Sequence, residues 1–361
     1  MVAVDPPPRS LALHDPQARL PADRLRVLLS VAQEGELPDQ YGVGGAVQRL
    51  EDRVAALLGK EAAVLMPTGS MASQVALRLH ADARTTRVIG FHPRAHVEVR
   101  ERKGYAVVHQ LVGKQLGDHD RLITLDDLQG VHEPLAAVLW ELPQRDIGGL
   151  LPDWDDLVAQ TGWARQHGVA AHLDGARLWE AQPYYSRSHA EIADLFDTVY
   201  VSLYKGLGGL AGAVLAGPGP LVAHAREWQA RLGGLLHHAW PLAVAAEIGL
   251  DGQLAQMQVY WVRAREIAAA LEDVAGVDVV PVVPQTPLFH VHVDAPREAL
   301  DAAHDELVEQ GGIRLYLYSR TTSPQRSRFE VTVGQNAMTL PVGDIRGAVH
   351  DLVHRAQRHH S

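Results

Sequence analysis

The chain has 361 residues, contains no cysteine and carries a formal net charge of −10 at pH 7. This composition excludes disulfides and thiol catalysis, and the lack of any Lys/Arg-rich run argues against a nucleic-acid partner. Residues 1–10 lack the apolar core of a signal peptide, and no apolar stretch approaches the roughly 20 residues that a membrane span requires. We therefore expect a cytoplasmic protein that binds neither membrane nor nucleic acid.

Helical and strand-like patterns alternate after an N-terminal segment, residues 1–40, in which we predict one helix at 22–34. Apolar residues recur at helical spacing from Val47 to Leu57, and Gly59 stands where a helix would end. The pattern predicts strands at 62–66, 87–91, 106–108, 136–139, 169–173 and 198–203, with helices at 71–80 and 154–167. Such alternation indicates an α/β large domain, residues 41–250, with a mostly parallel sheet between helices.

The pattern changes in the last third of the chain. Helices are predicted at 220–236 and 241–271, followed by strands at 277–283, 288–293 and 329–333 and helices at 297–310 and 342–358. We interpret residues 251–361 as a linking helix and a small C-terminal α+β domain.

A lysine in a glycine-rich turn is the most informative feature. Lys205 follows the predicted strand 198–203 and precedes Gly206-Leu207-Gly208-Gly209, while Asp174 ends the predicted strand 169–173. An enzyme that uses pyridoxal 5'-phosphate (PLP) needs a lysine for a Schiff base and a carboxylate that keeps the pyridinium nitrogen protonated. Together, in this order, the two segments predict a PLP enzyme with Lys205 and Asp174 as catalytic residues.

Two further segments suit an anionic cofactor or substrate. Thr68-Gly69-Ser70 stands between a predicted strand and a predicted helix, where free backbone N–H groups can hold a phosphate. The alternative is a capped turn without a ligand. Arg177, three residues after Asp174, has a guanidinium suited to a carboxylate or phenolate oxygen, and a surface ion pair is its alternative.

Two more candidates follow predicted strands. His96 comes after strand 87–91, where an imidazole could stack on a cofactor ring or move a proton; its alternative, in a chain with 20 histidines, is a purely structural role. Glu141 ends the apolar run 137–140, and a carboxylate at a buried strand end is costly unless it is paired. We include both in the predicted site. No zinc-ligand spacing is present, so we expect no metal.

These segments resemble the L-threonine aldolase family of fold-type-I PLP enzymes, within the β-eliminating lyase group. The matching stretches keep the family's order from Tyr41 to Trp240, with a weaker match on to Arg328. They are Tyr41-Gly42, Gly59-Lys60-Glu61-Ala62-Ala63, Pro67-Thr68-Gly69-Ser70-Met71-Ala72, Ala95-His96, Glu101 with Gly104, Glu141, Gly148-Gly149, His172-Leu173-Asp174-Gly175-Ala176-Arg177-Leu178, Lys205-Gly206-Leu207-Gly208 and Leu232-Gly233-Gly234.

The resemblance implies a PLP-dependent transferase-like large domain and a role for each matched residue. Lys205 would form the Schiff base, Asp174 would pair with the pyridinium nitrogen, and His96 would stack on the ring. Thr68, Gly69 and Ser70 would hold the phosphate. Arg177 and an arginine of the small domain would contact the substrate carboxylate or the cofactor; Arg328 is our choice for the small-domain arginine, with Arg326 and Arg320 as alternatives. The chain would form a homodimer or homotetramer, and Tyr41 would lie near the active site of the neighbouring subunit.

The resemblance also implies the reaction: cleavage of the Cα–Cβ bond of a threonine-like L-β-hydroxy-α-amino acid to glycine and an aldehyde. Departures from the family surround the substrate. Tyr204 replaces the usual serine before the lysine, and Leu236-His237-His238 replaces Met-Arg-Gln, whose arginine normally helps to bind phosphate. Another PLP reaction of an amino acid (β-elimination, transamination or racemisation) therefore stays open, as does a scaffold protein with a decayed site.

Overall fold

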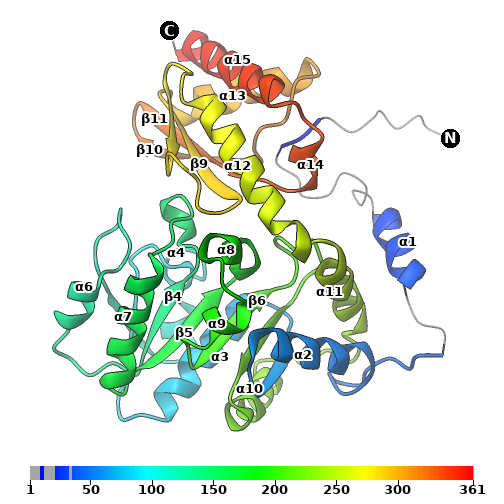
Figure 1. The fold of residues 1–361 in the computed structure, drawn as a ribbon, viewed down its shortest axis with the longest axis vertical. Coiled ribbons are helices and arrows are strands. Elements are labelled where there is room, and N and C mark those ends of the chain that lie inside the picture. Colours follow the sequence, from blue (N-terminus) through cyan, green and yellow to red (C-terminus); the bar gives the residue numbers. More distant parts are fainter. Residues whose placement is uncertain (1–8, 12–20, 32–34, 361) are drawn as a thin grey trace. The chain divides into compact units, whose positions relative to one another are not determined.

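The computed structural model describes residues 9–11, 21–31 and 35–360 and divides the chain into two compact units (Figure 1). The larger unit is Leu20–Gln256, and the smaller unit combines Met1–Arg19 with Met257–Ser361. Much of the predicted N-terminal segment, residues 1–8, 12–20 and 32–34, lies outside the described residues. The helix predicted at 22–34 corresponds to α1 (Pro21–Val31) as far as it is described.

A seven-stranded sheet forms the centre of the larger unit, in the order β1-β7-β6-β5-β4-β2-β3. Its pairings make β7 the strand that runs against the others, so the predicted, mostly parallel α/β sheet is confirmed. The strands are β1 (Ala62–Met66), β2 (Val88–Phe91), β3 (Val112–Gln115), β4 (Ala137–Glu141), β5 (Ala170–Gly175), β6 (Thr198–Ser202) and β7 (Ala213–Gly217).

Helices cover both faces of this sheet (Figure 1). On one face α3 packs on strands β5, β6 and β7, and its Val75 and Ala76 share a core cluster with Tyr200 of β6. On the other face the Trp140 indole of β4 donates to Gln160 of α7 at 2.9 Å. Besides α1, the described helices of this unit are α2 (Gly45–Leu58), α3 (Gly69–Asp82), α4 (His96–Val99), α5 (Gly104–Val107), α6 (Leu125–Gln129), η1 (Arg145–Ile147), α7 (Trp154–Gln166), α8 (Leu178–Tyr185), α9 (His189–Ala193), α10 (Gly219–Arg231), α11 (Trp240–Gly252) and η2 (Leu254–Gln256).

Two predicted elements need correction, and two strands of the large sheet were missed. The strand predicted at 106–108 is wrong, because these residues belong to α5 and its end, where Tyr105 packs on Phe91 while Val107 is 79% exposed. The edge strand that follows, β3, is exposed and was not predicted. Strand β7 was also missed, and the long helix predicted at 241–271 is divided by η2 into α11 and α12.

The smaller unit is an α+β structure, as predicted. Its four strands pair antiparallel in the order β10-β11-β9-β8. The elements are α12 (Met257–Leu271), β8 (Val277–Val280), β9 (Leu288–Val293), α13 (Arg297–Glu309), β10 (Ser319–Ser323), β11 (Arg326–Thr332), α14 (Gln335–Met338) and α15 (Val342–His360). Across the described parts of both units, we find no helix long and apolar enough to cross a membrane.

Candidate active site

Most of the predicted site residues meet at one edge of the large sheet. Strands β1, β2, β4, β5 and β6 run in the same direction, so their carboxyl ends share this edge. Open α/β sheets bind ligands beyond the carboxyl ends of their strands. The residues placed there are Thr68, Gly69 and Ser70 after β1, His96 after β2, Glu141 and Asp174 at the ends of β4 and β5, and Lys205 after β6.

Asp174 is the buried centre of this group. Its residue is 2% exposed, and its Oδ1 accepts a hydrogen bond from the Ala176 backbone N–H at 3.1 Å. Burial raises the pKa of the Asp174 carboxyl, although the nearby positive charges of Lys205 and His96 oppose this rise. A carboxylate held in this environment is stabilised by a cation, and a protonated pyridine nitrogen is a cation of suitable size and shape.

Lys205 lies on the turn after β6, where its carbonyl accepts a hydrogen bond from the Gly208 N–H at 3.1 Å. Burial and the positive charge of Arg177 lower the pKa of Lys205 to about 8, against the opposing effect of the Asp174 and Glu141 carboxylates. A lysine with a lowered pKa presents more of the neutral amine that attacks a carbonyl carbon.

His96 is held by two carboxylates. Its Nδ1 lies 2.8 Å from Glu101 Oε1, and its backbone N–H donates to Glu141 Oε2 at 3.1 Å. Glu101 in turn accepts from Gln74 Nε2 at 2.7 Å. Burial works against the charged imidazole, but the Glu101 hydrogen bond and the charge of Asp174 outweigh it and raise the pKa of His96. His96 therefore keeps its Nε2 available while Glu101 fixes the ring.

Glu141 shares this electrostatic environment with Asp174, its register partner on the next strand. Burial and the negative charge of Asp174 raise the pKa of Glu141 to about 7. Besides His96, its oxygens accept hydrogen bonds from Gln144 Nε2 at 3.2 Å and from the Arg145 backbone at 3.3 Å. These bonds tie the loop after β4 to the start of α4, so Glu141 positions His96.

Arg177 lies at the start of α8 beside a carboxylate that we did not predict. Its Nε is 4.0 Å from Glu180 Oε1, and the two residues are 8% and 2% exposed. A Cβ placed on Gly206 would lie 2.6 Å from Glu180 Cδ, so Glu180 lies directly against the backbone that follows Lys205. The i, i+3 spacing from Arg177 was the only sequence signal for Glu180. Glu101 was likewise seen as a matching residue but given no role.

The predicted phosphate segment forms the start of α3. Thr68 is the N-cap residue, and its Oγ1 accepts a hydrogen bond from the Met71 N–H at 3.2 Å. Gly69 and Ser70 occupy the first positions of this 14-residue helix, so their N–H groups have no acceptor within it. The positive end of the helix dipole points toward the same carboxyl edge.

Tyr41 and Arg328 belong to segments outside these strand ends. Tyr41 is 56% exposed in the 35–44 loop, and its ring lies 5.0 Å from that of His237. Arg328 belongs to the smaller unit, where its NH1 group lies 3.2 Å from Nδ1 of the buried His290. Arg326 is engaged in ion pairs with the carboxylates of Asp278 and Asp294.

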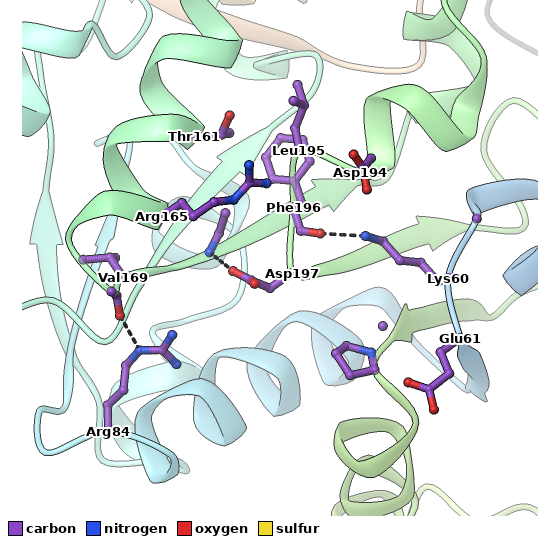
Figure 2. A pocket seen from close by; sticks show the side chains of 15 residues that line it. Lys60, Glu61, Arg84, Thr161, Arg165, Val169, Asp194, Leu195, Phe196 and Asp197 are labelled. Atoms are coloured by element: carbon purple, nitrogen blue, oxygen red, sulfur yellow. Dashed lines mark hydrogen bonds between the residues drawn. The ribbon is translucent and has the colours of Figure 1, made fainter.

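A separate hollow of about 410 Å³ lies at the opposite edge of the sheet, near the amino ends of β5 and β6 (Figure 2). Its charged lining is balanced, with three cationic and three anionic side chains: Lys60, Arg84, Arg165, Glu61, Asp194 and Asp197. Within the hollow, Lys60 donates to the Phe196 carbonyl at 2.7 Å. The described lining contains none of the residues predicted for the site, so we do not assign the chemistry to it.

The site at the carboxyl edge fits PLP. Asp174 is a buried carboxylate at the end of β5, Lys205 follows the end of the neighbouring strand β6, and the N-terminus of α3 lies after β1 at the same edge of the sheet. The site thus combines a buried carboxylate, a lysine of lowered pKa and a helix N-terminus that can bind an anion, all at one edge of a mostly parallel sheet. This combination is typical of PLP-dependent enzymes of fold type I.

Comparison with known proteins agrees with this class. The family model described as "Beta-eliminating lyase" matches residues 23–294. The low-specificity L-threonine aldolase of Escherichia coli (strain K12) is 30% identical over 247 residues, which are 67% of this chain and 73% of that protein. Low-specificity L-threonine aldolase 1 of Arabidopsis thaliana is 27% identical over 316 residues, 84% of this chain and 87% of that protein.

A solved structure extends the likeness to both units. It comes from Listeria monocytogenes EGD-E, from a protein proposed to be an L-allo-threonine aldolase, and it matches with a TM-score of 0.91 and 35% identity over 97% of each chain. The present chain belongs to the β-eliminating lyase family and, within it, to the threonine aldolases.

Proposed function

We propose that this chain is a PLP-dependent lyase that cleaves the Cα–Cβ bond of a threonine-like L-β-hydroxy-α-amino acid to glycine and an aldehyde. The observation that carries the proposal is the buried Asp174 carboxylate next to the turn of Lys205, at the carboxyl edge of the sheet. The names of the relatives support the choice of substrate, because the E. coli and A. thaliana proteins are low-specificity L-threonine aldolases.

PLP, when bound, supplies an electron sink for the electron pair of the broken Cα–Cβ bond. In our proposal Asp174 would keep the ring nitrogen protonated, and Lys205 would hold the cofactor covalently. Thr68, Gly69 and Ser70 hold the phosphate, and His96 lies against the ring. Glu141 acts through His96, whose backbone it binds.

Orientation of the substrate is assigned to two arginines. Arg177, with Arg328 from the smaller unit, would bind the substrate carboxylate and fix the rotation about the Cα–N bond. Holding a reactant in the productive geometry supplies a large part of many rate enhancements. Burial of Arg177 strengthens its hydrogen bonds to a carboxylate, because water competes less well for a guanidinium that is 8% exposed.

His96 would take the proton of the β-hydroxyl group at Nε2. Its Nδ1 is occupied by Glu101 at 2.8 Å, so Nε2 is the ring nitrogen left to face a substrate. A positioned general base is typically worth roughly 10²- to 10⁴-fold in rate.

Product analysis tests the proposal. L-Threonine, L-allo-threonine, L-serine and phenylserine are incubated with the PLP-loaded protein, and glycine, aldehyde, keto acid and ammonia are measured. We expect glycine and an aldehyde in equal amounts from at least one β-hydroxy substrate. A keto acid with ammonia, or the D-enantiomer, in place of an aldehyde would instead support β-elimination, transamination or racemisation.

The role of Glu101 predicts a shift in the pH profile. Activity requires neutral His96, so kcat/KM should rise with pH through the raised pKa of His96, which lies above its usual 6.5. Glu101→Gln removes the carboxylate that favours the charged ring, so the pKa falls and the rising limb moves to lower pH. The measurement is kcat/KM from pH 5 to 9 for wild type and variant.

Glu98→Gln is the matched control for this shift, because Glu98 lies in α4 together with His96 but accepts a hydrogen bond from the Tyr105 hydroxyl at 2.7 Å. Its profile should overlay that of the wild type. A Glu101→Gln profile that does not move, or that moves to higher pH, would remove His96 as the base.

We also propose that the chain forms a homodimer or homotetramer. Leu37 and Val43 are 81% and 71% exposed and lie on either side of Tyr41 in the 35–44 loop, and exposed apolar clusters of this kind mark contact surfaces. We expect sedimentation of the wild type to show no active monomer, and Val43→Asp to shift the population toward smaller species. An active monomer at assay concentration contradicts this. The cytoplasmic location stays a prediction from the sequence.

A further inference from the structure

Tyr200 is a buried residue of the large sheet that the sequence analysis left without a role. It lies in β6 and is the register partner of Asp174 in β5. Because paired residues of parallel strands project to the same face, its side chain stands beside that of Asp174. Tyr200 is 5% exposed, and its ring belongs to the core cluster between the sheet and α3.

The hydroxyl of Tyr200 reaches the N-terminus of α3. A Cβ built on Gly69, the first residue of that helix, would lie 1.9 Å from the Tyr200 hydroxyl oxygen and 2.3 Å from its Cζ. The phenol thus fills the space that a side chain at position 69 would need. Among the residues that the structure describes, this hydroxyl makes no hydrogen bond.

The hydroxyl oxygen of this largely buried residue is not among the fully enclosed atoms without a partner, so it keeps access to a ligand. Burial and the negative charge of Asp174 raise the pKa of Tyr200 well above its usual value, so the phenol keeps its proton and can act as a donor. The groups beside it, the free N–H groups of the first turn of α3, are donors as well. Donors that converge without an acceptor indicate an anion.

The neighbouring residues support a phosphate group as this anion. The segment Pro67-Thr68-Gly69-Ser70-Met71 has no lysine or arginine, so its own contribution to an anion consists of neutral donors and the helix dipole. His237, which stands where the family has its phosphate-binding arginine, is exposed and lies against Tyr41, with ring centroids 5.0 Å apart. A further neutral donor is therefore valuable here, since hydrogen bonds to a charged acceptor are stronger than those between neutral groups.

We propose that the Tyr200 hydroxyl donates a hydrogen bond to the phosphate of PLP and so completes the cradle formed by the start of α3. This inference rests on the proposed function, because it concerns the cofactor of the same site. Asp174 and Tyr200, side by side on neighbouring strands, would then bind the two ends of one molecule: the ring nitrogen and the phosphate.

The test compares two ligands that differ only in the phosphate. Apoprotein of the wild type and of Tyr200→Phe is titrated with PLP and with pyridoxal, and both dissociation constants are read from absorbance and protein fluorescence. We expect Tyr200→Phe to raise the Kd for PLP by roughly tenfold or more, as for a hydrogen bond to a charged group. The Kd for pyridoxal should stay within about twofold, since it lacks the acceptor.

Tyr185→Phe is the matched control. Tyr185 is also buried, but its hydroxyl donates to the Pro152 carbonyl at 3.0 Å. Its loss should leave both dissociation constants unchanged. Phenylalanine keeps the ring of Tyr200 in the core cluster, so we expect Tyr200→Phe to fold; circular dichroism of the apoprotein checks this. If Tyr200→Phe does not fold, Tyr200→Met is titrated in its place.

Each outcome decides one question. An unchanged Kd for PLP in the Tyr200 variant, or an equal loss for PLP and pyridoxal, overturns the phosphate contact and leaves the proposed function intact. A wild-type protein that binds neither ligand refutes the proposed function itself. A selective loss for PLP in Tyr200→Phe, without one in Tyr185→Phe, supports the inference.

Discussion

Asp174→Asn is expected to lower kcat by roughly 10²- to 10³-fold while the protein remains folded. An amide matches the shape of the carboxylate but lacks the charge that keeps a ring nitrogen protonated, and a nearby opposite charge typically shifts a pKa by roughly 1–3 units. Each lost unit is worth about 1.4 kcal/mol of differential stabilisation, or about tenfold in rate.

The stability of the same variant supplies a second readout. Folding raises the pKa of Asp174, so its charged form is less stable in the folded protein than in the unfolded chain. This carboxyl group therefore contributes stability below its unfolded pKa and loses that contribution as pH rises through the raised value. At pH 7 the apoprotein of Asp174→Asn should melt at the same temperature as the wild type or higher.

Asp197→Asn is the control for Asp174→Asn. Asp197 precedes β6 and accepts a hydrogen bond from the Ala171 N–H at 2.7 Å at the opposite end of β5, so its replacement tests the loss of a structural carboxylate that is bonded to the same strand. We expect near wild-type kcat there. Wild-type turnover in Asp174→Asn would refute the pairing with the ring nitrogen, and a collapse of its melting temperature would assign Asp174 a structural role.

Lys205→Ala is expected to abolish covalent attachment of PLP and to lower kcat by roughly 10³-fold or more, since nucleophile and proton carrier are lost together. Thr68, Gly69, Ser70 and Asp174 remain, so noncovalent PLP binding should persist. Borohydride reduction of the PLP-loaded wild type, followed by peptide mapping, should place the label on Lys205.

Lys60 is a stringent control for that label. Burial lowers the pKa of Lys60 as well, but this lysine lies at the other edge of the sheet, in the hollow of Figure 2. Lys60→Ala should therefore keep the label and the activity. A label on Lys60, or on no lysine, would contradict the assignment of Lys205.

The segments that could be read from the sequence are those whose signals are local. Strand β1 was predicted with its exact bounds because a short apolar run lies between Gly59 and the start of a helix, and Asp174 was predicted because it ends such a run. The wrong strand at 106–108 has the same composition as a buried strand. In the structure, however, Val107 belongs to α5, and Val107 and Val108 are both exposed.

The missed residues depend on contacts between distant segments. Tyr200 becomes informative only when its register with Asp174 and its approach to Gly69 are known. Glu180 gains meaning from the backbone of Gly206, which a linear pattern does not bring near it. Glu101 was visible as a matching residue, but its hydrogen bond to His96 requires the turn of α4.

The register across β4, β5 and β6 has a consequence for how the chain matures. Glu141, Asp174 and Tyr200 lie side by side on these three strands, and a slip of one residue in β5 would turn Asp174 toward the opposite face. A mispaired chain would then lack the partner of the ring nitrogen. A ligand stabilises only the conformation that binds it. The cofactor would therefore stabilise the correctly paired sheet over the mispaired one and so favour the native register during folding.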